Sequence, residues 1–450
     1  MEEISIKNRL ELMNVLPSEA CGEVFTRADV ANNVLKLLKT KPGVFSNPNY
    51  RFLDIYTKSG VFLLLIYSEL MQGLVEAIPD PELRSQHILG KMIYGISPSV
   101  ETALISRKTL YGDWSTQGNI KAIAGYKNDT GKRTFSNISK EFNGMKFDVV
   151  IGNPPYNNDM YLDFVTLAHQ LSSKYTCMIT PAKWQAKGGE KNEAFRKNIA
   201  PHMSDIVFHP DASNVFDIDM SGGITYYLIE KNKTGGTRIS CRGRSEILTN
   251  WAPEMGTDLD YIDIVEKIIM HRDLSGELDF RSITNAQDRR FIPVKSYFTS
   301  RNFGDVSEDT SSKYFMWSSA RCIRVPEYIF KNTVDMDKFK VYCNHNINNK
   351  PHPHILEPNV AAVRESCLMG FGSRVECESI ASYYSCRLIW YLAYGMKLGN
   401  ICTEAFKWVP DPGKFDHIFT DKELYDKYNL TPEEIAIIES VIKERKQGDK

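Results

Sequence analysis

FDVVIGNPPY, at residues 147–156, joins a short apolar run to a stiff polar loop. Four of the first six residues are β-branched or aromatic, a composition typical of a buried strand in a parallel sheet. The loop Asn153–Tyr156 begins where that strand ends, and open α/β sheets bind ligands at the carboxyl ends of their strands. The stretch therefore predicts a parallel sheet with a binding site at the strand ends.

Strand–turn–helix units precede this segment. A strand at 50–56, a turn at 57–60 and a helix at 61–71 form the first unit. In the second, a strand at 91–96 leads through Ser97-Pro98-Ser99, with Pro98 in the first helical turn, to a helix at 100–110. Further strands are predicted at 119–124, 176–180, 205–209 and 223–230, and further helices at 30–38, with Thr26 as N-cap, and at 162–171. This alternation predicts a doubly wound, mainly parallel α/β sheet of the Rossmann-like kind.

The chain of 450 residues is long enough for two compact cores. The alternation of strands and helices stops after a polar turn at 231–236, so we place a domain boundary near residue 245. The predicted domains are a doubly wound domain at 1–245 and a mixed α+β domain at 246–450. Helices are expected in the second domain at 260–270, 380–394 and 431–445, the last with a capping Thr-Pro-Glu-Glu start.

Composition points to a globular protein of the cytoplasm. The chain is 42% hydrophobic and 25% charged, as ordinary globular domains are. The longest apolar run, Val61–Tyr67, is too short to cross a bilayer, and the first residues lack a signal-peptide pattern. The nine cysteines are scattered, without a Cys-x-x-Cys pair, which is typical of reduced thiols. We expect a cytoplasmic location and no membrane association.

The net charge of −1 provides no overall attraction to a polyanion, so any nucleic-acid contact depends on local basic surface. Cationic and aromatic residues alternate along 287–304. Two interpretations stay open: contact with phosphates and bases, or a solvated loop with core aromatics. The residues concerned are Arg281, Arg289, Arg290, Phe291, Lys295, Tyr297, Phe298, Arg301 and Phe303.

A second cluster, of Cys343, His345, His352 and His354, contains ligand types that bind metals. Its spacing does not match that of zinc modules, and its loop is rich in Asn and Pro. We therefore predict no metal site.

The loop Asn153-Pro154-Pro155-Tyr156 suits one kind of chemistry. A conjugated amino group is a poor nucleophile, because its lone pair is delocalised. The Asn153 side-chain oxygen and the Pro154 carbonyl can both accept hydrogen bonds from such a group, while the prolines stiffen the loop. Tyr156 offers a flat ring on which a base can stack. The alternative is a rigid turn that only ends a strand.

The turn Leu53–Gly60 offers a place for a cofactor. Gly60 lets the backbone approach a ligand, and the Asp54 carboxylate can pair with an amino group. The same pattern also ends strands in folds that bind no such ligand.

Taken in chain order, Val24-Phe25-Thr26, Asp54–Gly60, Tyr94-Gly95-Ile96 and Asn153–Tyr156 resemble the γ-class amino-methyltransferases of bacterial restriction-modification systems. The resemblance covers about the first 240 residues, and the tail from Phe406 is similar as well. It implies a domain at 1–245 that binds S-adenosylmethionine and methylates N6 of a flipped-out adenine in double-stranded DNA. It also implies a target-recognition domain at 246–450 and a companion restriction endonuclease.

The resemblance also assigns roles to residues. The position of Thr26 contacts the cofactor carboxylate, and Asp54, Tyr56, Ser59 and Gly60 lie in the turn that holds its methionine part. Phe216, ahead of Gly222-Gly223, matches an aromatic that packs on the flipped base, although a core position explains a lone Phe equally well.

Two departures from the family pattern concern the cofactor. The turn reads Asp-Ile-Tyr-Thr-Lys-Ser-Gly instead of Asp-Pro-x-x-Gly-x-Gly, so only one of the expected glycines is present. Ser97 stands where the family has an acidic residue on the ribose, and a serine makes a weaker hydrogen bond there. Near the third strand, Asp113 and Asp129 are both candidates for a further acidic contact.

Several rival functions remain open on the sequence. Cytosine N4, RNA adenine and a protein glutamine amide all present a planar conjugated NH2 group. The long second half favours a polymer over a protein glutamine. A rival from another class is a DNA-binding specificity subunit with a degenerate methyltransferase fold that serves a partner nuclease.

Overall fold

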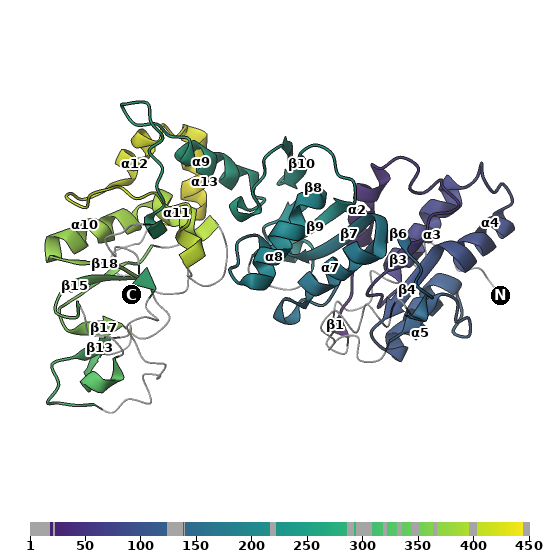
Figure 1. Cartoon of the computed structure of the whole chain (residues 1–450), viewed down its shortest axis with the longest axis horizontal. Helices are drawn as coiled ribbons and strands as arrows, with labels where there is room; N and C mark the ends of the chain where they lie inside the picture. Colours follow the sequence, from purple (N-terminus) through teal and green to yellow (C-terminus); the bar gives the residue numbers. More distant parts are fainter. Residues whose placement is uncertain are drawn as a thin grey trace. The chain divides into compact units, whose positions relative to one another are not determined.

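The computed structural model describes residues 19–20, 23–123, 138, 140–216, 222–285, 292–293, 308–317, 322–330, 335–343, 351–362, 367–395 and 403–443. The chain divides into two compact units, Met1–Thr257 (unit 1) and Asp258–Lys450 (unit 2) (Figure 1). The boundary predicted near residue 245 falls inside the last strand of the unit 1 sheet, so this unit extends further along the chain than expected.

The described part of unit 1 is built on a sheet in the order β11-β10-β8-β9-β7-β6-β3-β4-β5. Strands β5, β4, β3, β6 and β7 run parallel to one another. Strand β9 is antiparallel to both β7 and β8. The predicted doubly wound, mainly parallel sheet is confirmed. Its strands are β3 (Phe52–Asp54), β4 (Ile93–Ser97), β5 (Ile120–Ala122), β6 (Phe147–Gly152), β7 (Ser172–Pro181), β8 (Met203–His209), β9 (Ile224–Glu230), β10 (Thr237–Cys241) and β11 (Arg244–Leu248).

The sheet has its topological switch point between β3 and β6. From β3 the chain moves to β4 and β5 on one side, and then returns to β6 on the other side of β3. Asp54 at the end of β3 is paired with Ile151, two residues before Asn153. Because both strands point the same way, their carboxyl ends open the crevice in which such sheets bind ligands.

Successive side chains of each strand enter opposite cores. Phe52, for example, packs in one hydrophobic cluster and Leu53 in the other. Both cores are apolar, and the second is rich in aromatic side chains, which explains why the inner strands have largely apolar sequences. The first cluster includes α2 (Ala28–Lys39), α3 (Val61–Gly73), α5 (Val100–Tyr111) and the π-helical turn η1 (Ile88–Met92), and the second includes α7 (Met160–Leu171) and α8 (Glu190–Asn198).

The remaining elements of unit 1 are short. They connect the strands and helices or flank them (Figure 1). They are β1 (Glu19–Ala20), β2 (Glu23–Val24), α4 (Pro81–His87), η3 (Asn157–Asp159), η4 (Ala182–Gln185), η5 (Ala200–His202), η6 (Ala212–Asn214) and η7 (Pro253–Met255).

Three local predictions need correction. Thr26 is not a helix cap: α2 begins one residue later than that cap requires, and its N-cap Arg27 makes no side-chain capping bond. Pro98 lies before the helix, because Ser99 is the N-cap of α5 and closes a capping box with Thr102. The hairpin of β10 and β11 was not expected, since its exposed strand β11 shows no apolar run.

The described part of unit 2 contains two small sheets, β12-β18-β15-β16 and β14-β13-β17, beside a group of helices. The mixed α+β character predicted for this half is confirmed. Its elements are α9 (Leu259–Ile269), η8 (Ile283–Asn285), β12 (Ile292–Pro293), β13 (Phe315–Trp317), β14 (Cys322–Arg324), η11 (Glu327–Ile329), β15 (Phe339–Cys343), β16 (His354–Leu356), β17 (Val360–Ala362), β18 (Cys367–Gly372), α10 (Arg374–Ser385), α11 (Arg387–Gly395), η12 (Thr403–Phe406), α12 (Asp421–Lys427) and α13 (Pro432–Val441).

The helices of unit 2 pack around α11, which contacts α9, α12 and α13. The helix predicted at 380–394 is in fact two helices, because the backbone is extended at Cys386 between α10 and α11. Thr431 caps α13 in a reciprocal capping box with Glu434, as predicted, although the helix ends at Val441. Within the described ranges, no helix is both long and apolar enough to span a bilayer.

Candidate active site

Asn153, directly after β6, is held by one hydrogen bond. Its Nδ2 donates to Thr26 Oγ1 over 3.0 Å, and both residues are buried. Thr26 lies just before α2, so this bond links two segments that are 127 residues apart. A threonine hydroxyl that accepts here keeps its own proton to donate elsewhere, and among the described residues it makes no second bond.

The other end of the Asn153 amide has no partner. Its Oδ1 is buried and accepts no hydrogen bond within the described structure. An unsatisfied buried acceptor costs about 1–3 kcal/mol, so proteins rarely retain one without a use. The bond to Thr26 fixes the amide with this oxygen directed away from the hydroxyl. Asn153 is therefore preorganised as a hydrogen-bond acceptor.

The rest of the loop is rigid. Pro154 and Pro155 are buried, and Tyr156 is half-buried, with its ring 6.3 Å from that of Tyr161 in an edge-to-face arrangement. The next turn contains two residues with left-handed backbone, Asn158 and Asp159, at φ of 52° and 57°. The second of these is held by an ion pair with Lys187 at 2.5 Å. A strained turn anchored in this way restricts the movement of the tyrosine.

The glycine turn lies beside this loop, at the end of β3. Asp54 Oδ1 accepts a hydrogen bond from the Tyr56 amide over 3.1 Å. Gly60 has φ of 78°, and a Cβ there would approach the Ser106 Cα and carbonyl oxygen to 3.0 Å. Only glycine fits that position without strain. Ser59, the neighbour of Gly60, is buried in the same turn.

Burial controls the ionisation of the aspartate in this turn. Removal from solvent raises the pKa of Asp54 from 3.8 to about 7, and the Tyr56 amide, Thr57 and the Lys58 ammonium offset this only in part. The carboxyl group thus changes charge near neutral pH. A cation placed beside it would favour the ionised form.

Three predicted site residues face the protein interior. Tyr56 is 2% exposed and packs edge-to-face on Phe164, with the ring centres 5.4 Å apart. Ser97 is fully buried, with its hydroxyl 2.9 Å from the Thr57 carbonyl oxygen and 2.7 Å from the Thr102 hydroxyl. Phe216 is 1% exposed and belongs to the hydrophobic cluster on the α2 face. The structure thus brings Thr26, Asp54 and the loop at Asn153 together, whereas Tyr56, Ser97 and Phe216 have core contacts. Their expected contacts with ligands stay predictions.

Sequence reasoning missed three contributors to the site. The Thr57 hydroxyl lies 3.1 Å from the Ser106 hydroxyl, which also donates to the Lys58 carbonyl and so ties the turn to α5. Lys58 is buried, and its Nζ lies 5.3 Å from the centre of the Tyr56 ring. The departure from the glycine pattern was the one signal that pointed to Lys58.

The other candidate groups that the structure describes lie outside this site. Asp113 caps its own loop by accepting from Ser115 and Thr116, and those bonds lower its pKa to about 2. Asp129, His345 and the predicted basic-aromatic side chains of 287–304 fall outside the described residues. His352 and His354 pack against tryptophan rings, and the described ranges contain no group of three potential metal ligands.

The fold is a Rossmann-like doubly wound sheet, and the candidate site lies at its switch point. Residues 91–160, from η1 through the loop at Asn153, match the family model of the Eco57I restriction-modification methylase. The chain is 26% identical to an "uncharacterized adenine-specific methylase" of Mycoplasma pneumoniae, over 52% of this chain and 72% of the relative. These matches confirm the resemblance to γ-class adenine methyltransferases.

One solved structure supports the fold, and a second is a more distant match. The DrdV–DNA complex, a cryo-EM structure, matches with a TM-score of 0.50 and 11% identity, over 91% of this chain and 58% of that chain. The M protein of the type I restriction enzyme EcoKI matches with a TM-score of 0.36 and 15% identity, over 49% of this chain and 46% of that chain. The present chain thus spans only about half the length of these two proteins.

The raised pKa of Asp54 predicts a stability effect that needs no ligand. The folded protein keeps the Asp54 carboxyl neutral up to about pH 7, whereas the unfolded chain ionises it from about pH 4. The free energy of unfolding therefore falls between about pH 4 and pH 7, by at most about 1.4 kcal/mol per pH unit. Urea denaturation of wild type and Asp54→Asn from about pH 5 to 8 measures this. The difference in unfolding free energy, wild type minus variant, should fall up to about pH 7 and then level off. A difference that grows with pH would contradict the assignment.

Proposed function

We propose that the chain transfers a methyl group from S-adenosylmethionine to N6 of an adenine flipped out of double-stranded DNA. The observation that carries this proposal is the buried, unpaired Oδ1 of Asn153 at the switch point of the sheet. The family match at residues 91–160 and the adenine-specific relative support the same substrate class.

The loop provides the acceptors that the reaction needs. Asn153 Oδ1 and the Pro154 carbonyl oxygen each accept one N–H of the adenine amino group. Two acceptors below the nitrogen favour a pyramidal geometry, which directs the lone pair at the incoming methyl group. The half-buried ring of Tyr156 stacks on the base, so that the adenine must leave the duplex to enter the site.

The residues around the glycine turn fit the cofactor. When bound, S-adenosylmethionine supplies an electrophilic methyl group on a sulfonium sulfur. Asp54, buried and poised near neutral pKa, pairs with its amino group, and Gly60 keeps the backbone of the turn open. Tyr56 and Ser59 complete the turn, and the position of Ser97 at the end of β4 is the place for the ribose.

Thr26 joins the two halves of this site. Its hydroxyl accepts from Asn153 Nδ2 and has a proton left to donate to the cofactor carboxylate. Cofactor binding would then hold the hydroxyl lone pair toward Asn153. The amide oxygen would in turn be held toward the adenine.

Unit 2 is the proposed target-recognition region, with double-stranded DNA as partner and a companion restriction endonuclease in the cell. Support comes from the restriction-modification names of the matched family and structures, one of which was solved on DNA. The cytoplasm, where such DNA is found, is the proposed location.

The Asn153→Ala variant tests the central claim. Incubation with radiolabelled S-adenosylmethionine and mixed-sequence bacterial DNA, followed by mass spectrometry of nucleosides, should show N6-methyladenine for wild type and a loss of about 10²–10³-fold for the variant. Asn192→Ala is the matched control, because this buried asparagine in α8 also has an unpaired Oδ1. Label in cytosine, or equal losses in both variants, would overturn the assignment.

Thr26→Val tests the positioning of the amide. Without the hydroxyl, Asn153 is free to present its NH2 group, so we expect kcat to fall about tenfold or more and the cofactor Kd to rise about tenfold. Thr26→Ser keeps the hydroxyl and should restore most of both. Thr166→Val, in α7, controls for the loss of a threonine hydroxyl elsewhere in unit 1. A valine variant with wild-type kcat would show that Thr26 does not orient the amide.

A second candidate function has one observation in its favour. Lys58 is buried where the family has a glycine, within the turn that would hold the cofactor. A side chain there suits a DNA-binding specificity subunit that has lost methylation and serves a partner nuclease. The unpaired Asn153 oxygen speaks for the enzyme, since a binding module gains nothing from it.

Calorimetry with S-adenosylmethionine distinguishes these two functions. Lys58 does not have a left-handed backbone, and its ammonium folds onto the Tyr56 ring. We therefore expect wild type to bind the cofactor, and Lys58→Gly to bind within about threefold of it, because the Lys58 side chain is folded onto the Tyr56 ring and the substitution leaves the backbone of the turn unstrained. Heat of binding in Lys58→Gly but none in wild type would favour the degenerate subunit.

A further inference from the structure

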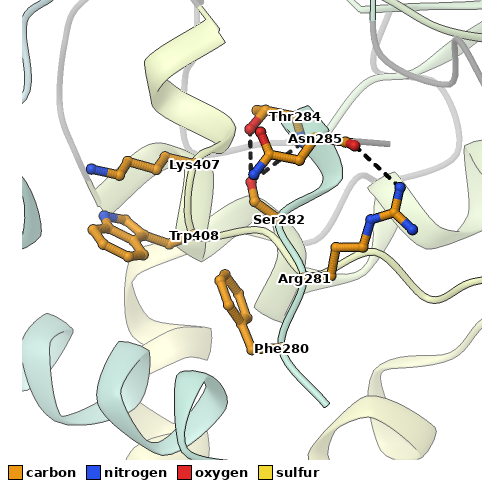
Figure 2. A pocket seen from close by; sticks show the side chains of 7 residues that line it. All are labelled: Phe280, Arg281, Ser282, Thr284, Asn285, Lys407 and Trp408. Carbon is orange, nitrogen blue, oxygen red and sulfur yellow. Dashed lines mark hydrogen bonds between the residues drawn. The ribbon is translucent and has the colours of Figure 1, made fainter. Parts of the chain in front are cut away.

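Unit 2 contains a cavity of about 600 Å³ (Figure 2). Its lining comes from two segments, 280–285 around η8 and Lys407–Trp408 after η12. A volume of this size is typical of sites for small organic ligands and exceeds what ordinary surface irregularities provide.

The two segments are fixed to each other by backbone pairing. The Ile283 amide donates to the Val409 carbonyl over 2.9 Å, and the Asp411 amide donates to the Arg281 carbonyl over 2.7 Å. An antiparallel bridge joins Ser282 to Pro410 between these bonds. The walls of the pocket are therefore preorganised, although they come from distant parts of the sequence.

Flat rings and hydrogen-bonding groups face the same space. Figure 2 shows Trp408 and Phe280 near one another, with Ser282, Thr284 and Asn285 on the opposite side. Both rings are half-buried, so part of each stays accessible from the pocket. The side chain of Asn285 is exposed, and its amide can pair with the edge of a base.

Two cations border the pocket. Lys407 Nζ lies 4.8 Å from the centre of the Trp408 ring, and no described carboxylate pairs with it. Arg281 Nε lies 3.8 Å from the buried Asp411 carboxylate, while 53% of its side chain stays exposed. The ratio of two cations to one carboxylate favours an anionic ligand.

We propose that this pocket binds a nucleotide, with the base stacked on Trp408 and the phosphate at Lys407. The inference rests on the proposed function, because the DNA substrate is the natural source of such a group. A concave pocket lined with rings suits an unstacked base better than the edge of a closed duplex. Asn285 would read the base edge.

The test uses the full chain and fluorescence anisotropy with a labelled mixed-sequence oligonucleotide, as duplex and as single strand. Trp408→Ala should weaken binding about tenfold or more, whereas Trp408→Phe, which keeps a flat ring, should weaken it less than about threefold. Lys407→Gln should reduce the slope of log K against log salt by about one. Lys414→Gln, an exposed lysine of the same unit outside the pocket, should behave as wild type.

Free deoxynucleoside monophosphates as competitors identify the source of the ligand. Displacement of the oligonucleotide by millimolar mononucleotide assigns the pocket to free nucleotides, and its absence, with Trp408-dependent binding, assigns it to a DNA strand. Wild-type affinity in Trp408→Ala and Lys407→Gln for every probe overturns the inference. Measuring methyl labelling of DNA in the same preparations keeps the two proposals apart. If DNA is labelled but binding does not depend on Trp408, only the proposal for the pocket is overturned. If binding depends on Trp408 but DNA is not labelled, only the proposed methyltransferase activity is overturned.

Discussion

The parallel pairing of β3 with β6 is the constraint on which the rest of unit 1 depends. It sets Asp54 and Asn153 at neighbouring strand ends although they are about a hundred residues apart in the chain. The apolar residues of both strands keep this register, because a slip by one residue would turn the side chains of Phe52 and Leu53 toward the wrong cores. Hydrophobic packing on both faces of the sheet thus sets the distance between Asp54 and Asn153.

Two polar groups at this point of the sheet are left without full hydrogen bonding or charge compensation. The Asn153 amide satisfies its nitrogen through Thr26 and leaves its oxygen without a donor, and Asp54 is buried at the expense of its ionisation. Each of these raises the free energy of the folded state. Both groups would recover this energy when a donor or a cation binds, so this energetic cost favours ligands that supply both.

Much of this arrangement follows from sequence patterns, and the remainder depends on contacts between distant segments. The strand of β6 and the helices α3 and α5 lie close to where their apolar patterns predict them, since burial on both faces leaves a strong signal. The exposed strand β11 and the break at Cys386 leave none. Thr26 was expected to cap a helix, because local sequence cannot show that its hydroxyl contacts a residue on a distant strand.

The glycine turn shows that two glycines of one motif have separable physical tasks. Gly60 is required by the backbone, through its positive φ and its contact with Ser106 on α5, and it is retained. The position of Lys58 makes no such demand on the backbone, so a side chain can occupy it without strain in the turn. What changes there is charge: an ammonium lies close enough to Asp54 to favour the ionised carboxyl, against the effect of burial. The substitution therefore acts on the electrostatics of the turn while its geometry is preserved.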